Sequence, residues 1–149
     1  MKKFKFRYES VLKMRMNEED RIKNELAKKI KERQNILDAL ENLSNDELEY
    51  LKHIDSVLRS GKANKEMHSF SEGKKYYKTL RDQYKLKLSK VEADIEGIKQ
   101  LLVEAMKSRK VMDKLKEKAF QTYIDEYNEM DAKLIEEVVN YKNNKSNGE

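Results

Sequence analysis

The feature that most constrains this chain is a stripe of residues between positions 88 and 112. Its members recur at alternating steps of three and four, which places them on one narrow side of an α-helix. The stripe consists of Leu88, Val91, Ile95, Ile98, Leu102, Ala105, Arg109 and Met112. Exposing one Leu or Ile to water costs about 1.5–3 kcal/mol relative to burying it, so a second helix of the same period should cover the stripe. The first half of the chain is the candidate for that helix.

Composition indicates that both helices are long. The 149 residues include no Pro and only four Gly, so little in the sequence kinks or stops a helix. Charged residues make up 41% and hydrophobic residues 38%, and the two kinds are interspersed along the chain. Such a mixture does not fill a thick core, whereas it suits a thin seam between two helices. We therefore predict an all-α fold, an antiparallel two-helix coiled-coil hairpin.

Turn and capping signals place the helix boundaries. Arg59-Ser60-Gly61 is typical of a helix C-terminus, with Gly in the left-handed position after the last turn. Ser69-Phe70-Ser71-Glu72 has the pattern of a capping box, which marks a helix start. We predict one hairpin over residues 1–142, with a helix over about 8–60, a turn over about 61–70 and a helix over about 71–142. The polar residues 143–149 are predicted to be disordered.

Two positions leave alternatives open. Ser44-Asn45-Asp46-Glu47 is also a capping box, at which the first helix would restart and give three segments. The helix-forming residues on both sides favour a continuous helix. Arg109 interrupts the apolar stripe, and the simpler interpretation is a side chain that snorkels to water. The alternative is a polar residue that fixes the register of the two helices.

The second predicted helix is the longer one, so its later part should extend past the first. This would expose Tyr123, Ile124, Tyr127 and Met130 as a candidate binding surface. Tyrosine is frequent at protein interfaces, because its ring is apolar and its hydroxyl binds water. The tyrosines near the turn and near position 125 fit an interaction surface and seam packing equally well.

The sequence argues against an enzyme. It has no Cys, no glycine-rich phosphate loop and no H-E-x-x-H pair, and a hairpin lacks a pocket that excludes water. Glu49 and His53 lie one turn apart, but this spacing is more typical of a surface pair than of metal ligands. The acidic runs Glu18-Glu19-Asp20 and Glu136-Glu137 are typical of a solvated surface. We expect no catalytic residues, no cofactor and no metal site.

Charge and hydropathy limit the partners. The net charge is +5, but acidic residues interrupt the lysine groups, so we do not expect nucleic acid as the partner. No apolar run approaches the length of a membrane span, so we expect no membrane insertion. The opening residues alternate basic and aromatic side chains and do not resemble a signal peptide. We expect a soluble protein that is not exported.

Two stretches resemble the family of the flagellar export protein FliJ, a small coiled-coil component of the flagellar type III secretion apparatus. The first stretch is Phe4-Lys5-Phe6-Arg7-Tyr8-Glu9-Ser10-Val11-Leu12-Lys13-Met14-Arg15, which is similar to the family's opening. The second runs from Glu104 to Lys118 and is similar to part of the family's second helix, with Tyr123 and Glu126 following. Tyr8 stands where Leu is more usual in the family.

The resemblance implies a function in bacterial flagellum biogenesis. It implies a non-enzymatic hairpin, similar to the central-stalk subunit of rotary ATPases, whose open end inserts into the ring of the export ATPase FliI. It also implies binding to the export-gate protein FlhA and to export chaperones, in the cytoplasm and peripherally at the inner face of the cell membrane. For the ATPase end we predict Phe4, Phe6, Arg7, Leu115, Lys118, Tyr123 and Tyr127. For the gate end we predict Leu43, Tyr50, Tyr76 and Leu80.

Two other hypotheses fit the same periodicity. One is a generic coiled-coil spacer or dimerisation arm, whose excess lysines would contact nucleic acid with a steep salt dependence. The other is an oligomeric bundle in which hairpins pair through exposed Tyr and Leu side chains. Sedimentation at several protein concentrations tests the second of these.

Overall fold

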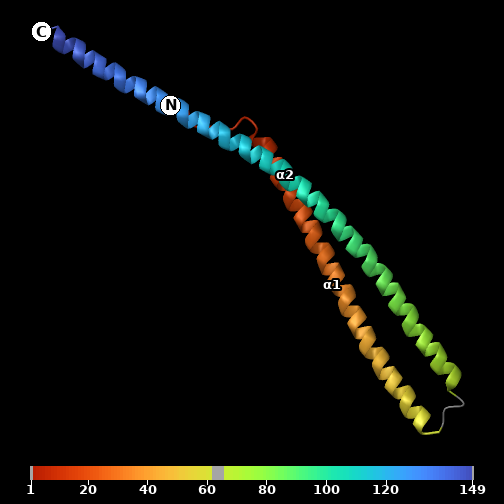
Figure 1. Ribbon diagram of the computed structural model, residues 1–149. Helices are drawn as coiled ribbons and strands as arrows, with labels where there is room; N and C mark the ends of the chain where they lie inside the picture. Colours follow the sequence, from red (N-terminus) through yellow and green to blue (C-terminus); the bar gives the residue numbers. More distant parts are fainter. Residues whose placement is uncertain (1, 62–65, 149) are drawn as a thin grey trace. The chain divides into compact units, whose positions relative to one another are not determined.

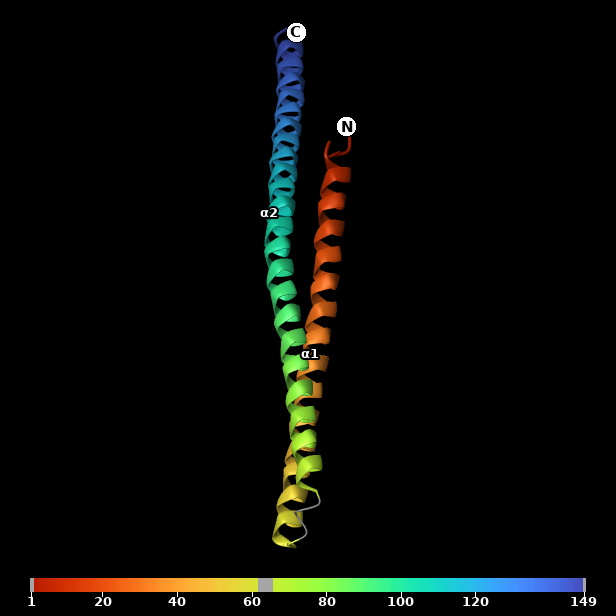
Figure 2. The same ribbon diagram turned by 90° about the vertical axis from the view of Figure 1, so that its right-hand side faces the viewer.

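The computed structural model describes residues 2–61 and 66–148 and contains two α-helices (Figure 1). Helix α1 spans Glu9–Arg59 and helix α2 spans Met67–Asn147. The described residues contain no strand, and the two helices run antiparallel alongside each other (Figure 2). The predicted fold class, an all-α antiparallel two-helix hairpin, is confirmed. Across the described residues, neither helix carries an apolar stretch of the length that crossing a membrane requires.

The chain divides into two compact units, and each helix contributes to both. Unit 1 combines the residues up to Asp20 with those from Val103 onward, and unit 2 is Arg21–Leu102. Within each unit, segments of α1 and α2 that are far apart in sequence pack against each other.

Unit 2 is held together by apolar side chains from both helices. The buried residues are Ile22, Leu43 and Ile54 from α1 and Phe70, Val91 and Ile95 from α2. Two ion pairs also connect the helices. The Lys29 Nζ atom lies 3.4 Å from Asp94 Oδ2, and Arg81 Nη2 donates to both carboxylate oxygens of Glu47 at 2.8 Å.

The Ser44 to Glu47 capping box does not start a helix. Helix α1 continues through it, and the Glu47 carboxylate accepts hydrogen bonds from Arg81 on α2. A side chain committed to a partner on the other helix is not available to cap its own backbone. The continuous helix favoured by the flanking residues is therefore the one that forms.

Helix α2 begins at Met67, earlier than the start predicted near residue 71. The Phe70 ring is buried against Tyr50 of α1, with the ring centroids 6.5 Å apart, and the Phe70 N–H donates to the Glu66 carbonyl at 2.9 Å. The capping pattern at Ser69 predicted the start too late, because burying Phe70 favours another turn of helix.

Helix α1 ends at Arg59 and is followed by a glycine in the left-handed conformation. Gly61 has a φ of 76°, a conformation that residues with a Cβ rarely adopt. The Ser60 hydroxyl donates to the Val57 carbonyl at 2.7 Å and so satisfies one of the last carbonyls of the helix. The part of the predicted turn at residues 62–65 lies outside the described residues.

The polar segment predicted to be disordered is helical as far as Asn147. Its residues 143–147 include no Gly or Pro, and the Ser146 hydroxyl donates to the Asn143 carbonyl at 3.3 Å. Polar composition predicted disorder, but these residues extend an existing helix, which costs less free energy than nucleating a new one. Glu149, also part of that prediction, lies outside the described residues.

Candidate partner-binding surface

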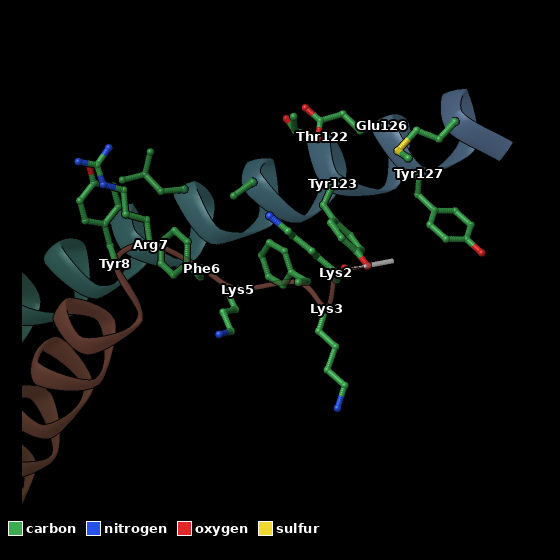
Figure 3. A pocket seen from close by; sticks show the side chains of 14 residues that line it. Lys2, Lys3, Lys5, Phe6, Arg7, Tyr8, Thr122, Tyr123, Glu126 and Tyr127 are labelled. Atoms are coloured by element: carbon green, nitrogen blue, oxygen red, sulfur yellow. Dashed lines mark hydrogen bonds between the residues drawn. The ribbon is translucent and has the colours of Figure 1, made fainter. Parts of the chain in front are cut away.

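Residues 2–8 pack along α2 within unit 1 without forming helix or strand (Figure 3). The Phe4 ring lies edge-on to Phe120 at a centroid distance of 5.2 Å and lies 5.6 Å from Tyr123. The Tyr123 hydroxyl donates to the backbone carbonyl of Lys2 at 2.8 Å. Figure 3 shows Lys3 and Lys5 pointing away from α2. We call residues 2–8 the basic-aromatic segment, because it alternates cations, which are exposed, with aromatic residues, of which Phe4 packs against α2.

A short turn joins the basic-aromatic segment to α1, and both the backbone and the side chain of Glu9 make contacts there. The Glu9 N–H donates to the Phe6 carbonyl at 3.2 Å, and the Glu9 carboxylate lies 2.9 Å from Lys116 Nζ on α2. A carboxylate in the first turn of a helix is also favoured by the helix dipole. These contacts hold the segment beside the same stretch of α2.

A groove of about 1360 Å³ lies between the basic-aromatic segment and α2. Its charged residues are the cations Lys2, Lys3, Lys5 and Arg7 and the acidic Glu126. Its apolar lining comes from Phe4, Phe6, Tyr8, Leu115, Ala119, Tyr123, Tyr127 and Met130. Such a groove suits a partner that presents apolar side chains together with negative charge.

Helix α2 continues past the start of α1 (Figure 2). Every residue from Asp125 to Gly148 is exposed. We call residues 125–141 the acidic extension, because they hold six carboxylates against one lysine. The exposed apolar side chains of this stretch are Tyr127, Met130, Leu134, Ile135, Val138, Val139 and Tyr141. Helices of this kind normally owe their stability to packing of an apolar face, so the acidic extension lacks a covering partner within the described residues.

Arg109 forms the polar centre of unit 1. It donates from Nε to Glu19 on α1, whose side chain is buried, and from Nη1 to Asp113 one turn further along α2. The hydrogen bonds that Arg109 donates, first to Glu19 and then to Asp113, raise the pKa of Arg109 above its ordinary value. Of the two sequence interpretations, the structure supports register fixing over snorkelling, since the guanidinium reaches a buried carboxylate on the other helix.

The residues predicted for the ATPase end come together, with one exception. Six of them line the groove, and these are Phe4, Phe6, Arg7, Leu115, Tyr123 and Tyr127. Lys118 is exposed but does not line it. Tyr123 and Ile124, expected to be exposed, are half-buried. For Tyr123 the cause is the packing of Phe4, a contact that the helical periodicity alone does not reveal.

The residues predicted for the gate end lie in unit 2 and differ in exposure. Leu43 is only 8% exposed and packs in the seam, so its side chain offers little surface to a partner. Tyr50 and Leu80 are half-buried, and the Tyr50 ring lies 5.3 Å from that of Tyr77. Tyr76 is 60% exposed and is the most accessible of the four.

Two parts of the surface were not predicted. The three lysines and Tyr8 of the basic-aromatic segment line the groove, although only Phe4, Phe6 and Arg7 of this segment were predicted as contacts. The apolar face of the acidic extension continues past Met130 to Tyr141. Its signal was present in the spacing of Leu134, Val138 and Tyr141, at steps of four and three.

Comparison with known proteins gives one match. A search of curated proteins found no match, and a search of solved structures found none either. A scan against protein families matched residues 4–148 to the family described as flagellar FliJ protein. Since this match covers nearly the whole chain, the protein belongs to the flagellar FliJ family and has a role in flagellar protein export.

Proposed function

We propose that the protein is a non-enzymatic stalk of the flagellar export apparatus, which binds the export ATPase FliI through unit 1. The groove carries this proposal. It brings aromatic and apolar side chains from the basic-aromatic segment and from α2 to one surface, as a docking site for another protein requires. The acidic extension adds exposed apolar area beside it.

The same proposal places contacts to the export gate FlhA and to export chaperones on unit 2. Its support is the aromatic group near the turn, where Tyr76 packs edge-on to Tyr77 at 5.5 Å and remains largely exposed. Exposed tyrosine is a frequent anchor in protein interfaces. Such contacts would hold the protein in the cytoplasm, peripherally at the inner face of the cell membrane.

Co-purification with the ATPase and stimulation of ATP hydrolysis test the ATPase contact. We expect Tyr127→Ala to weaken binding by about tenfold or more, as loss of an interface tyrosine commonly does. Val111→Ala is the matched control, because Val111 is an exposed apolar residue of the same unit that does not line the groove. Absence of binding by the unmodified protein at low salt would contradict the proposal.

Pull-down with the cytoplasmic part of FlhA tests the gate contact separately. Tyr76→Ala should reduce capture, whereas Leu86→Ala should not, and both side chains are 60% exposed in unit 2. Equal losses for the two variants would argue against a specific contact at Tyr76.

A further inference from the structure

Unit 1 carries two surfaces of opposite character that do not cover each other. The groove is apolar and is bordered by the four cations of the basic-aromatic segment, which contains no acidic residue. The acidic extension is apolar on one side and carries six carboxylates and one lysine. The two surfaces share Glu126, Tyr127 and Met130 at their junction, and apart from these residues they carry charge of opposite sign.

The apolar residues of the acidic extension have the spacing that a helix needs for lying in a groove. Tyr127, Met130, Leu134, Val138 and Tyr141 follow at steps of three, four, four and three, so they share one side of the helix. Each of them is at least 43% exposed. A helix-in-groove contact uses anchors at this spacing.

We propose that the free protein forms a twofold symmetric dimer in which the acidic extension of each copy lies in the groove of the other. The groove includes Tyr127 and Met130, where the extension begins, so two antiparallel α2 helices that cross near Tyr127 make both contacts at once. A contact that is repeated by a twofold axis closes the assembly at two copies.

Charge distinguishes this dimer from the simplest alternative, in which two acidic extensions pair with each other. That arrangement would bring six carboxylates of one copy against six of another, with one lysine on each side. Like charges across an interface oppose association, whereas the groove supplies Lys2, Lys3, Lys5 and Arg7. The two arrangements therefore respond to salt in opposite directions.

Sedimentation velocity of the full chain over a range of concentrations tests the dimer. We expect a monomer–dimer equilibrium that weakens between about 0.1 M and about 1 M NaCl, as the Debye length falls from about 10 Å to about 3 Å. A chain that stays monomeric up to sub-millimolar concentration overturns the proposal. So does association that strengthens with salt, or that grows into an open polymer.

A matched pair of substitutions locates the interface. Leu134 and Val111 are both 58% exposed apolar residues of α2 in unit 1, but only Leu134 lies in the acidic extension. Leu134→Asp should raise the dimer dissociation constant by about tenfold or more, and Val111→Asp should leave it within about twofold. The reverse order, or equal effects, overturns the assignment. Circular dichroism establishes that both variants keep their helix content.

Charge reversal tests the pairing of the two surfaces directly. One variant carries Lys3→Glu and Lys5→Glu, and the other carries Asp131→Lys and Glu137→Lys. Each should self-associate about tenfold more weakly than the unmodified chain, whereas their mixture should form a heterodimer that keeps one unmodified contact and, in the other, pairs the introduced carboxylates with the introduced lysines. Failure of the mixture to associate more tightly than either variant alone overturns the proposal. These measurements use the chain by itself, so their outcome is independent of any binding to the ATPase.

Discussion

The two units of the hairpin use α2 in different ways. In unit 2, α2 contributes Phe70, Val91 and Ile95 to a seam that α1 covers. In unit 1, α2 contributes Ala105 to the buried seam but then continues through Asp125 to Gly148 with every residue exposed. In unit 2 each helix therefore covers the apolar side of the other, whereas part of unit 1 presents an apolar face that no other described residue covers.

Hydrogen exchange gives the largest expected difference between the two regions. In dilute protein, amides of residues 128–146 should exchange at least about a thousandfold faster than those of residues 86–102, because local opening of an unpacked helix costs little free energy while opening the packed seam approaches global unfolding. Mass spectrometry of peptides from the two regions measures this ratio. Similar protection in both regions would mean that the acidic extension is stable without a partner.

Substitution of Arg109, in the polar centre of unit 1, should cause the largest loss of stability that we expect from a single substitution. Arg109→Met removes the cation that binds the buried Glu19 carboxylate, whereas Arg81→Met removes a cation from the more exposed Glu47 of unit 2. The unfolding midpoint should fall further for Arg109→Met, since water screens the pair in unit 2 more strongly. Urea denaturation followed by circular dichroism measures both midpoints.

A second variant tests whether the loss comes from the charge that remains. Combining Arg109→Met with Glu19→Leu replaces both charged partners with apolar groups and should recover most of the lost stability. A double variant no more stable than Arg109→Met would show that the packing around Arg109, rather than the buried carboxylate, causes the loss.

Alanine substitution at two glycines of α2 should change the stability of unit 2 in opposite directions. The two glycines lie on the same helix in different surroundings. A Cβ built on Gly73 would lie 1.9 Å from the Tyr50 hydroxyl oxygen, whereas nothing lies within 4 Å of a Cβ at Gly97. Gly73→Ala should therefore displace the Tyr50 ring and destabilise the unit by about 1–3 kcal/mol. Gly97→Ala should stabilise it by about 0.5–1 kcal/mol, as alanine favours helix.

Thermal or urea unfolding of the two glycine variants measures these opposite effects. The NMR ring-current shifts of the Tyr50 ring protons in Gly73→Ala report whether the ring has moved relative to Phe70 and Tyr77. Stabilisation by both substitutions would show that Tyr50 moves aside at no cost and does not hold the turn end together.

The seam was predictable because it depends on local spacing. The apolar stripe from Leu88 to Met112 specifies which side of α2 is covered, because it does not depend on which residues of α1 lie opposite. Val91, Ile95 and Ala105 of this stripe are buried. The length of the second helix also predicted that Tyr127 and Met130 are exposed, and both line the groove.

Contacts that depend on register between distant residues were not predictable. The pairing of Glu19 with Arg109 joins residues 90 apart, and it depends on the register of α1 against α2 within unit 1. The packing of Phe4 on Phe120 has the same origin, because nothing in an alternating basic and aromatic segment specifies which helix it will lie on. Polarity alone also misplaced the end of α2, since helix propagation extended it to Asn147.

The smallest expected effect concerns pH and the Lys29 pair of unit 2. Hydrogen bonds to Glu32 and then Asp94 raise the pKa of Lys29 from its ordinary value of 10.5. A raised pKa means that the folded state holds the proton more tightly than the unfolded state, so the stabilisation is complete below pH 10.5 and is lost as pH rises through the raised value. The difference in unfolding midpoint between the unmodified protein and Lys29→Met should be constant between about pH 6 and pH 9 and should shrink above about pH 10.5. Lys28→Met controls for removal of a neighbouring lysine, and a Lys29 difference that already shrinks near neutral pH would place the responsible proton on another group.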